Sequence, residues 1–360
     1  MNTEYPSIPQ KRILIFGASG HIGGPLANHV HINNPLVELR LVTSNPDRIE
    51  ELEDRFPFAQ CMHCDYRDCE SLDVALEGVD GVFMITPDLI DEQVACTNLV
   101  NTIKKKQISP HVVRIMGDPP GVKIDDVPES LRSHGNGVGA AISHQIARNI
   151  LSESGIEVTF LNVAGYYMDD LSGLWHGRGI REANILVEIK RHYMPYVDPS
   201  EVGEAAAIIL TRDLASDVGV TYHLNNGHDI VDFYSVAKIL SKEIGRKITY
   251  REGEKDWLRY TGNDLESTFG KGAKDYFLHY FRWESVMIEK VLFRSLGFLL
   301  GGIAISLLRY SPRFALNPVV HITTKMMSFG TDNSLKKILG RNPMRLREWV
   351  QLNRNKFDQC

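Results

Sequence analysis

Short apolar runs alternate with amphipathic stretches along the first 165 residues. Apolar runs of this kind are typical of strands that are buried on both faces of a parallel sheet. They lie at residues 13–16, 38–43, 59–63, 81–85, 112–116 and 157–162. Because helices are predicted between them, the pattern predicts a parallel, doubly wound α/β sheet with right-handed crossovers.

The stretches between the strands indicate where the helices lie. One predicted helix follows the first strand, and a second follows the Asn45-Pro46-Asp47 turn. Further helices are predicted at 71–76, 92–106 and 140–154. From Asp118 to Gly139 the chain is rich in Pro, Gly and Asp and shows no period, which predicts a long loop over the active face.

A glycine-rich turn follows the first strand directly, in the sequence ILIFGASGHIGG from Ile13 to Gly24. Gly17, Gly20 and Gly23 are spaced by three residues, and the apolar positions that follow predict a helix. A turn of this kind brings backbone N–H groups and the helix N-terminus close to a phosphate. The stretch therefore predicts a dinucleotide site, whereas the alternative is a tight turn that needs glycine only for steric reasons.

The rest of the chain has a mixed pattern. A strand that starts at 196–198 leads into a helix at 199–210, and a strand at 221–224 precedes a helix at 233–245. We expect a Rossmann core at 1–165 and a smaller α+β portion at 166–360. This smaller portion is expected to interleave with the core and to bind the substrate.

Composition narrows the class of protein. The chain has 360 residues, of which 43% are hydrophobic and 24% are charged, as in ordinary globular proteins. A net charge of −5 argues against a nucleic-acid partner. The first ten residues are polar and carry no secretory signal, and the five cysteines are an odd number. We therefore expect free thiols and a cytoplasmic location.

The most hydrophobic stretch is Ser295–Leu308, fourteen residues without a charge. It is shorter than the roughly 20 residues that a helix needs to cross a bilayer. A buried helix or a homodimer contact is the simpler interpretation. A hydrophobic wall for an apolar substrate and a peripheral membrane contact remain as alternatives.

Several segments together resemble the NmrA-like family of atypical short-chain dehydrogenase/reductases. They are GASGHIGG after the first strand, NPDR after the second, DYRDCESLDVALEGVDGVFMITP from Asp65, SGIEVTFLNVAGYYMDD, YVDPSEVGEAAAIIL and GRNPMRLREWV. The resemblance spans about 12–256 and 331–350, whereas 271–329 fits the family poorly and is expected to be an insertion.

This resemblance implies a bound NAD(P) along the carboxyl edge of the sheet. It places the cofactor against Gly17, Ser19, Gly20, His21, Ile22, Gly23, Ser44, Asn45, Arg48, Asp65, Ile85, Thr86 and Pro87. Sites specific for NAD usually have a carboxylate after the second strand, and none stands there. This favours NADP. The family's usual arginine is replaced by Ser44, so Arg48 is the nearest cation and NAD stays an alternative.

Reduction of a carbonyl needs an acid near the developing oxyanion. Short-chain reductases supply it from a Tyr-x-x-x-Lys pair, which occurs here only at Tyr234–Lys238, far from the expected helix. That helix instead carries His144, where related isoflavone-reductase-like enzymes have a lysine. An ordinary imidazole pKa would suit a catalytic acid, and a surface histidine without a chemical role is the alternative.

Two tyrosines and a cysteine pair complete the candidates. Tyr166 and Tyr167 follow the sixth strand, where the family's substrate pocket opens, and are expected to be a pocket wall or a proton donor. The sequence Cys61-Met62-His63-Cys64 has no second ligand pair, so no metal site is predicted.

Three functions fit these observations. The first is an NAD(P)H-dependent oxidoreductase that acts on a small hydrophobic carbonyl or unsaturated compound, for example in secondary metabolism, with the 271–329 insertion as part of a pocket or lid. The second is a non-catalytic dinucleotide sensor of the NmrA type, which the missing Tyr-x-x-x-Lys pair favours. The third is a membrane-surface protein that uses residues 295–308.

Overall fold

A parallel sheet of seven strands forms the core of the computed structural model, which describes residues 11–118, 122–163, 165–212, 216–287 and 333–358. The strand order is β12-β8-β5-β4-β1-β2-β3. The strands are β1 (Lys11–Phe16), β2 (Val37–Thr43), β3 (Gln60–His63), β4 (Gly81–Met84), β5 (His111–Met116), β8 (Val158–Asn162) and β12 (Thr221–His223). The order reverses between β1 and β4, and such a switch point opens a crevice at the carboxyl ends of the strands.

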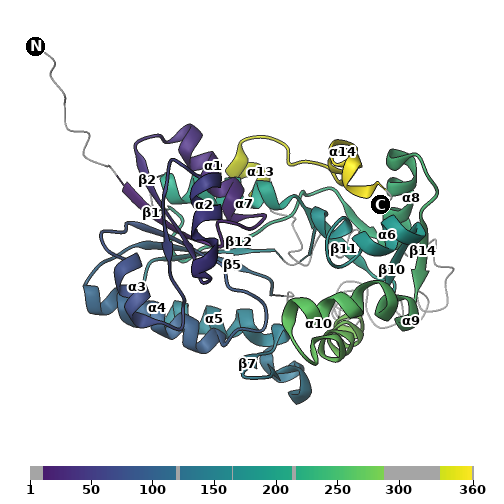
Figure 1. The fold of residues 1–360 in the computed structure, drawn as a ribbon, viewed down its shortest axis with the longest axis horizontal. Helices are drawn as coiled ribbons and strands as arrows, with labels where there is room; N and C mark the ends of the chain where they lie inside the picture. The colour runs from purple at the N-terminus through teal and green to yellow at the C-terminus, as the bar shows by residue number, and fades with distance from the viewer. Residues whose placement is uncertain (1–10, 119–121, 164, 213–215, 288–332, 359–360) are drawn as a thin grey trace, which may run out of the picture.

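Helices cover both faces of this sheet (Figure 1). One face packs against α1 (Gly23–Asn33), α2 (Ile49–Arg55), α7 (Pro199–Thr211) and α13 (Ser334–Leu339). The other packs against α3 (Cys69–Ala75), α4 (Glu92–Lys106) and α5 (Ala140–Glu153). The doubly wound fold predicted from the sequence is therefore confirmed.

Close packing of α1 on α7 depends on a small side chain. A Cβ atom on Gly203 would lie 2.4 Å from the carbonyl oxygen of Ile22. Only glycine allows α7 to approach the end of the glycine turn so closely. Thus a helix far along the chain supports the start of α1.

Two small sheets, one mixed and one parallel, form the second part of the molecule, which lies beside the carboxyl edge of the main sheet (Figure 1). A three-stranded sheet joins β9 (Tyr166–Tyr167), β11 (Tyr193–Val197) and β13 (Ile230–Asp232), and β10 (Ile185–Glu188) pairs with β14 (Thr249–Glu252). The helices are α6 (Gly177–Ala183), α8 (Phe233–Ile244), α9 (Glu254–Trp257), α10 (Asn263–Phe269) and α14 (Leu346–Leu352). Shorter helical turns of this part are η4 (Met168–Leu171), η6 (Leu258–Gly262) and η7 (Arg354–Phe357). A further turn, η1 (Pro46–Arg48), follows β2 in the core.

A helix at 273–287 closes one side of this second part. Its aromatic residues belong to a buried cluster that also contains Trp257 and Leu265. The same cluster includes Leu131 and Ile142, which belong to the core side of the molecule. The helix is therefore packed against the segment that leads into α5, and its position is set by apolar burial.

The segment at 118–139 is more regular than the sequence predicts. It contains the turns η2 (Ile124–Asp126) and η3 (Glu129–Leu131) and a hairpin of β6 (Ser133–His134) and β7 (Gly137–Val138). The Val138 N–H donates to the Ile90 carbonyl at 3.0 Å, which holds the hairpin against the chain after β4. Elements of two or three residues are too short to produce a visible period, so the sequence predicted a long loop here without these turns and this hairpin.

The apolar stretch Ser295–Leu308 lies outside the described residues. Within the part of the chain that the structure describes, no helix has the length and apolar character needed to cross a membrane.

Candidate functional site

The glycine turn has the geometry of a phosphate cradle. Gly17 has a φ of +67°, and a Cβ atom there would lie 2.7 Å from Cγ2 of Ile85. A Cβ on Gly23 would lie 2.4 Å from the Gly17 carbonyl oxygen. The turn therefore requires glycine at both positions. Ile22 caps α1 without a side-chain hydrogen bond. The Gly24 N–H already donates to the Gly20 carbonyl at 3.2 Å and Pro25 has no N–H, so an anion at this end of the helix would depend on the N–H groups that precede Gly24.

A pocket of about 380 Å³ lies next to the glycine turn. It brings together seven residues of the predicted cofactor set, namely Gly17, Ser19, Ser44, Arg48, Asp65, Ile85 and Pro87. Thr86 lines a second cavity instead. Asn45 is used locally, since its side chain accepts from the Asp47 N–H at 3.0 Å and caps η1.

Two arginines border this pocket. Arg48 forms two hydrogen bonds to Glu51, at 3.0 and 3.1 Å. Arg67 binds the carboxylate of Asp65 at 2.7 and 3.1 Å, and this hydrogen bonding lowers the pKa of Asp65. Sequence reasoning missed Arg67, although a cation two residues after Asp65 was the available signal. Both guanidinium groups are partly exposed at the edge of this pocket.

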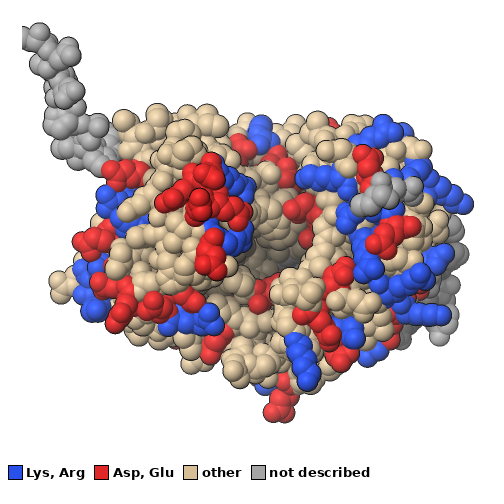
Figure 2. Space-filling model, viewed as in Figure 1, with Lys and Arg blue, Asp and Glu red and all other residues tan. Residues whose placement is uncertain are grey.

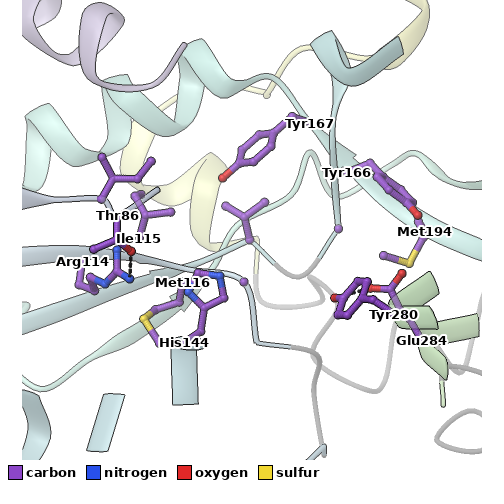
Figure 3. Close-up of a pocket in the computed structure, with 14 residues that line it drawn as sticks. Thr86, Arg114, Ile115, Met116, His144, Tyr166, Tyr167, Met194, Tyr280 and Glu284 are labelled. Carbon is purple, nitrogen blue, oxygen red and sulfur yellow. Dashed lines mark hydrogen bonds between the residues drawn. The ribbon is translucent and has the colours of Figure 1, made fainter. Parts of the chain in front are cut away.

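A second cavity, of about 240 Å³, lies between the sheet edge and the second part of the molecule (Figure 3). Ile85 lines both cavities, so they adjoin along the carboxyl edge. The space-filling view shows a hollow near the middle of the molecule, with mostly uncharged residues around it and acidic side chains at its margin (Figure 2). The second cavity is lined by Ile85, Thr86, Arg114, Ile115, Met116, Gly117, His144, Val163, Gly165, Tyr166, Tyr167, Met194, Tyr280 and Glu284.

His144 reaches this cavity from α5. A Cβ atom on Gly117 would lie 2.9 Å from its Nε2, so the glycine makes room for the ring. The buried Nδ1 atom has no hydrogen-bond partner among the described residues. Burial, followed by the charges of Arg114 and Arg148, lowers the pKa of His144 to about 3. The expectation of an imidazole pKa near neutrality was therefore wrong: His144 is a neutral hydrogen-bonding group.

A buried charged network lies beside His144. Arg114 on β5 donates through Nη2 to Glu92 Oε1 at 2.6 Å and to Thr86 Oγ1 at 2.7 Å. The Thr86 hydroxyl donates to Glu92 Oε2 at 2.8 Å, so its direction is set by both partners. Sequence reasoning missed Arg114 because it treated 112–116 as an apolar strand. A charge inside such a strand was the available signal.

The two predicted tyrosines lie on β9 and line the same cavity. The Tyr166 hydroxyl is 3.3 Å from Nε2 of His192. The ring of Tyr167 lies 4.9 Å from the ring of His21. Burial raises the pKa of both tyrosines well above the usual value, so each keeps its phenolic proton.

His21 connects the glycine turn to the second part of the molecule. Its Nδ1 lies 2.8 Å from Oδ2 of Asp169 on η4. Burial opposes the charged imidazolium, but the hydrogen bond and charge of Asp169 raise the pKa of His21 above its usual value. The turn and the cavity wall are thus joined by one polar contact.

Other candidates lie elsewhere. The Lys238 ammonium lies 4.4 Å from the ring centre of Tyr234 on α8, and neither residue lines the two cavities described above. Cys64 is buried near Ser71 Oγ, at 3.9 Å. In the described ranges, no group of three or more His, Cys, Asp or Glu residues is placed to hold a metal ion.

Comparison with known proteins identifies the family. The model of the NmrA-like family matches residues 9–272. The chain belongs to the NmrA-like family. This confirms the resemblance inferred from the sequence. The match includes the glycine turn, His144 and both tyrosines of β9, and it ends before the helix at 273–287.

Solved structures share the fold over most of the chain. An NADPH-dependent quinone oxidoreductase from Escherichia coli in complex with NADPH is 17% identical with a TM-score of 0.62, and the match covers 95% of this chain and 99% of that one. A triphenylmethane reductase from Citrobacter sp. in complex with NADP(H) is 19% identical with a TM-score of 0.58, and the match covers 94% and 99%. NmrA, a negative transcriptional regulator in complex with NADP, is 17% identical with a TM-score of 0.52, over 73% and 83%.

Proposed function

We propose that this protein binds NADP across the two adjoining cavities and reduces a small hydrophobic carbonyl or unsaturated compound. The observation that carries the proposal is the shared wall at Ile85. On one side of it lie the glycine turn and most of the predicted cofactor residues. On the other side lie His144, Tyr166 and Tyr167. The pyrophosphate would lie in the turn, and the nicotinamide would face the second cavity.

The preference for NADP rests on charge. The pocket beside the glycine turn is lined by Arg48 and Arg67 and by two carboxyl residues, Asp65, which Arg67 holds, and Asp88. Thr43, Ser44 and Asn45 at the end of β2 supply no carboxylate for the ribose hydroxyls. Quinone and dye reductases of this fold, solved with NADPH and NADP(H), support the same choice. NAD is the weaker alternative, and NmrA has been solved with NAD as well.

The residues of the second cavity support substrate reduction by positioning. NADPH, when bound, supplies a hydride equivalent. The neutral His144 ring offers one N–H donor and one acceptor, so it can hydrogen-bond a carbonyl oxygen of the substrate. Tyr167 keeps its proton and is a second donor. The proton that completes the reduced product comes from solvent, since His144 carries no extra proton near neutral pH.

A sensor function is the second candidate. It is favoured by the absence of an acid with a suitable pKa at His144, and by the fold shared with the NmrA regulator. In this case NADP would bind in the same two cavities, and its binding would be signalled to a protein partner.

Two measurements test these proposals. Calorimetry with NADPH, NADP+, NADH and NAD+ tests the cofactor, and failure to bind any of them would contradict both candidates. The loss of NADPH fluorescence with a panel of quinones, enals and ketones then separates the two. Turnover supports the reductase, and dinucleotide binding without turnover of any panel member favours the sensor.

A further inference from the structure

The end of the second cavity formed by the helix at 273–287 is acidic. Tyr280 and Glu284 are one helical turn apart and both line the cavity (Figure 3). The Tyr280 hydroxyl donates to Oε1 of Glu284 at 2.9 Å. Both residues lie beyond the part of the chain that matches the family, so this wall is a property of this chain.

A buried carboxyl stands near Glu284, which is itself half-buried. Glu188 on β10 is 3% exposed, and its Oε1 accepts from the Ile189 N–H at 2.7 Å. Within the described ranges, neither glutamate forms an ion pair with an arginine or a lysine. Buried carboxylates are normally paired with a cation, because desolvation of an isolated charge is costly. Among the described residues, this end of the cavity therefore carries carboxyl groups without a paired cation.

The pKa values agree with this geometry. Burial raises the pKa of Glu284 to about 7. Burial also raises the pKa of Glu188 to about 8, with a smaller contribution from the charge of Glu284. Without a cationic partner, the two carboxyls are thus partly protonated near neutral pH. A positive charge placed beside them would stabilise their ionised forms.

Aromatic and sulfur groups complete this end of the cavity. Tyr166 lies on β9 and Met194 on β11, and both line the cavity together with Tyr280. Aromatic rings and a thioether suit the apolar body of a ligand, and aromatic faces also attract cations. At about 240 Å³, the cavity suits a compound of one or two rings.

We propose that the acidic end of the cavity binds an organic cation, such as an ammonium or iminium group on a ring substrate, and that Glu284 selects for that charge. This inference rests on the proposed function and names the substrate class. The cationic group would lie at Glu284, and the reducible centre would lie toward His144 and Thr86, which line the other end (Figure 3).

A matched pair of ligands tests the charge. We use 3-hydroxyphenyltrimethylammonium and its uncharged isostere 3-tert-butylphenol, measured by calorimetry on the full chain with and without NADP+. We expect the cation to bind about tenfold more tightly than the isostere or better. Equal affinity of the two ligands would overturn the proposal. Dinucleotide affinity is measured separately. Failure to bind any dinucleotide would contradict the proposed function, whereas normal dinucleotide binding without a preference for the cation would contradict only this inference.

A charge-removing variant tests the residue. E284Q keeps the shape of the side chain, and we expect it to weaken cation binding about tenfold while the affinity for 3-tert-butylphenol changes little. E266Q, at an exposed glutamate of α10, is the matched control and keeps the preference. Retention of the preference in E284Q contradicts the assignment.

The pH dependence of the wild-type protein provides a second test that needs no variant. Other titratable groups around this end are Tyr166, His192, Tyr196, Tyr276, Tyr280, Glu188 and Asp88. The tyrosines Tyr166, Tyr196 and Tyr280 have pKa values raised well above the usual value, so they stay protonated. For this test the ligands are phenyltrimethylammonium and tert-butylbenzene, which carry no ionisable group. Since a cation binds the ionised carboxyls, the affinity for phenyltrimethylammonium is expected to rise severalfold between about pH 6 and about pH 8.5, whereas that for tert-butylbenzene stays constant. A flat profile for the cation would contradict the proposal.

Discussion

Arg114 and Glu92 form an ion pair of 2.6 Å beneath the second cavity, and each side chain is only 1% exposed. The pair also sets the direction of the Thr86 hydroxyl. Two charges are therefore held out of water where β4 and β5 end beside the second cavity. Loss of either partner is expected to affect stability.

Removal of one partner of this pair is expected to be strongly destabilising. E92Q leaves the Arg114 guanidinium buried without its counter-charge, and we expect a loss of about 3 to 5 kcal/mol in the free energy of unfolding. Urea denaturation measures this loss. E254Q breaks an exposed pair with Arg282 and should cost less than about 1 kcal/mol. Similar losses in the two variants would contradict the interpretation.

Gly17→Ala is expected to weaken dinucleotide binding about tenfold or more, because the new Cβ meets Ile85 at a φ of +67°. Gly155→Ala is a matched control, since Gly155 has a φ of +75° with no atom within 4 Å of the Cβ position. The control should lose stability of about 1 kcal/mol and keep its affinity for NADPH. Calorimetry and urea denaturation measure the two effects. Equal NADPH affinities in the two variants would exclude a role of the turn in binding.

The choice of cofactor is expected to depend on Arg48. R48Q removes a cation beside the predicted 2′-phosphate site, so the affinity for NADPH should fall about tenfold while that for NADH changes little. R67Q should also lower the affinity for NADPH, and by more than R48Q, because it also frees the Asp65 carboxylate. R259Q alters an exposed arginine of η6 and is the control. Equal losses for NADPH and NADH would show that neither arginine senses the phosphate.

His144 makes stability depend on pH. Its pKa of about 3 in the folded chain is below the value of about 6.5 in an unfolded chain. Between these values the unfolded state binds more protons, so the free energy of unfolding falls as the pH is lowered from about 6.5 toward about 3. H144N removes this contribution, and its unfolding free energy should change less between about pH 7 and about pH 5 than that of the wild type. The difference between the wild type and H144N reports on His144 alone, because His111 and His176, whose pKa values are also lowered by burial, are present in both proteins.

The same residue provides a test of catalysis. If a neutral imidazole polarises the substrate, turnover by the wild type shows no loss from protonation of His144 between about pH 5 and about pH 8. H144A should lower kcat by about tenfold or more with a substrate found in the reductase panel. An unchanged kcat would remove His144 from the mechanism and leave it a packing role against Gly117.

Local patterns were sufficient to predict the sheet and the glycine turn. A strand buried on both faces must be apolar, and a turn at positive φ needs glycine, so both features are visible in a few consecutive residues. The order of the motifs also indicated the family, which the family comparison confirmed. The strands β9, β10, β13 and β14 were missed or only partly indicated because they are short and their pairing partners are far away in the sequence.

The chemistry of the site was decided by tertiary contacts. No local pattern shows that Arg114 and Arg148 act on His144, or that burial keeps its ring neutral. The acidic wall at Glu284 arises because packing of aromatic residues brings the helix at 273–287 against the core, far from the strands in sequence. Hydrophobic periodicity is set by the side chains of consecutive residues, so it is visible in the sequence. The pKa of a group and the composition of a cavity wall depend instead on which residues, distant in sequence, share the same low-dielectric space.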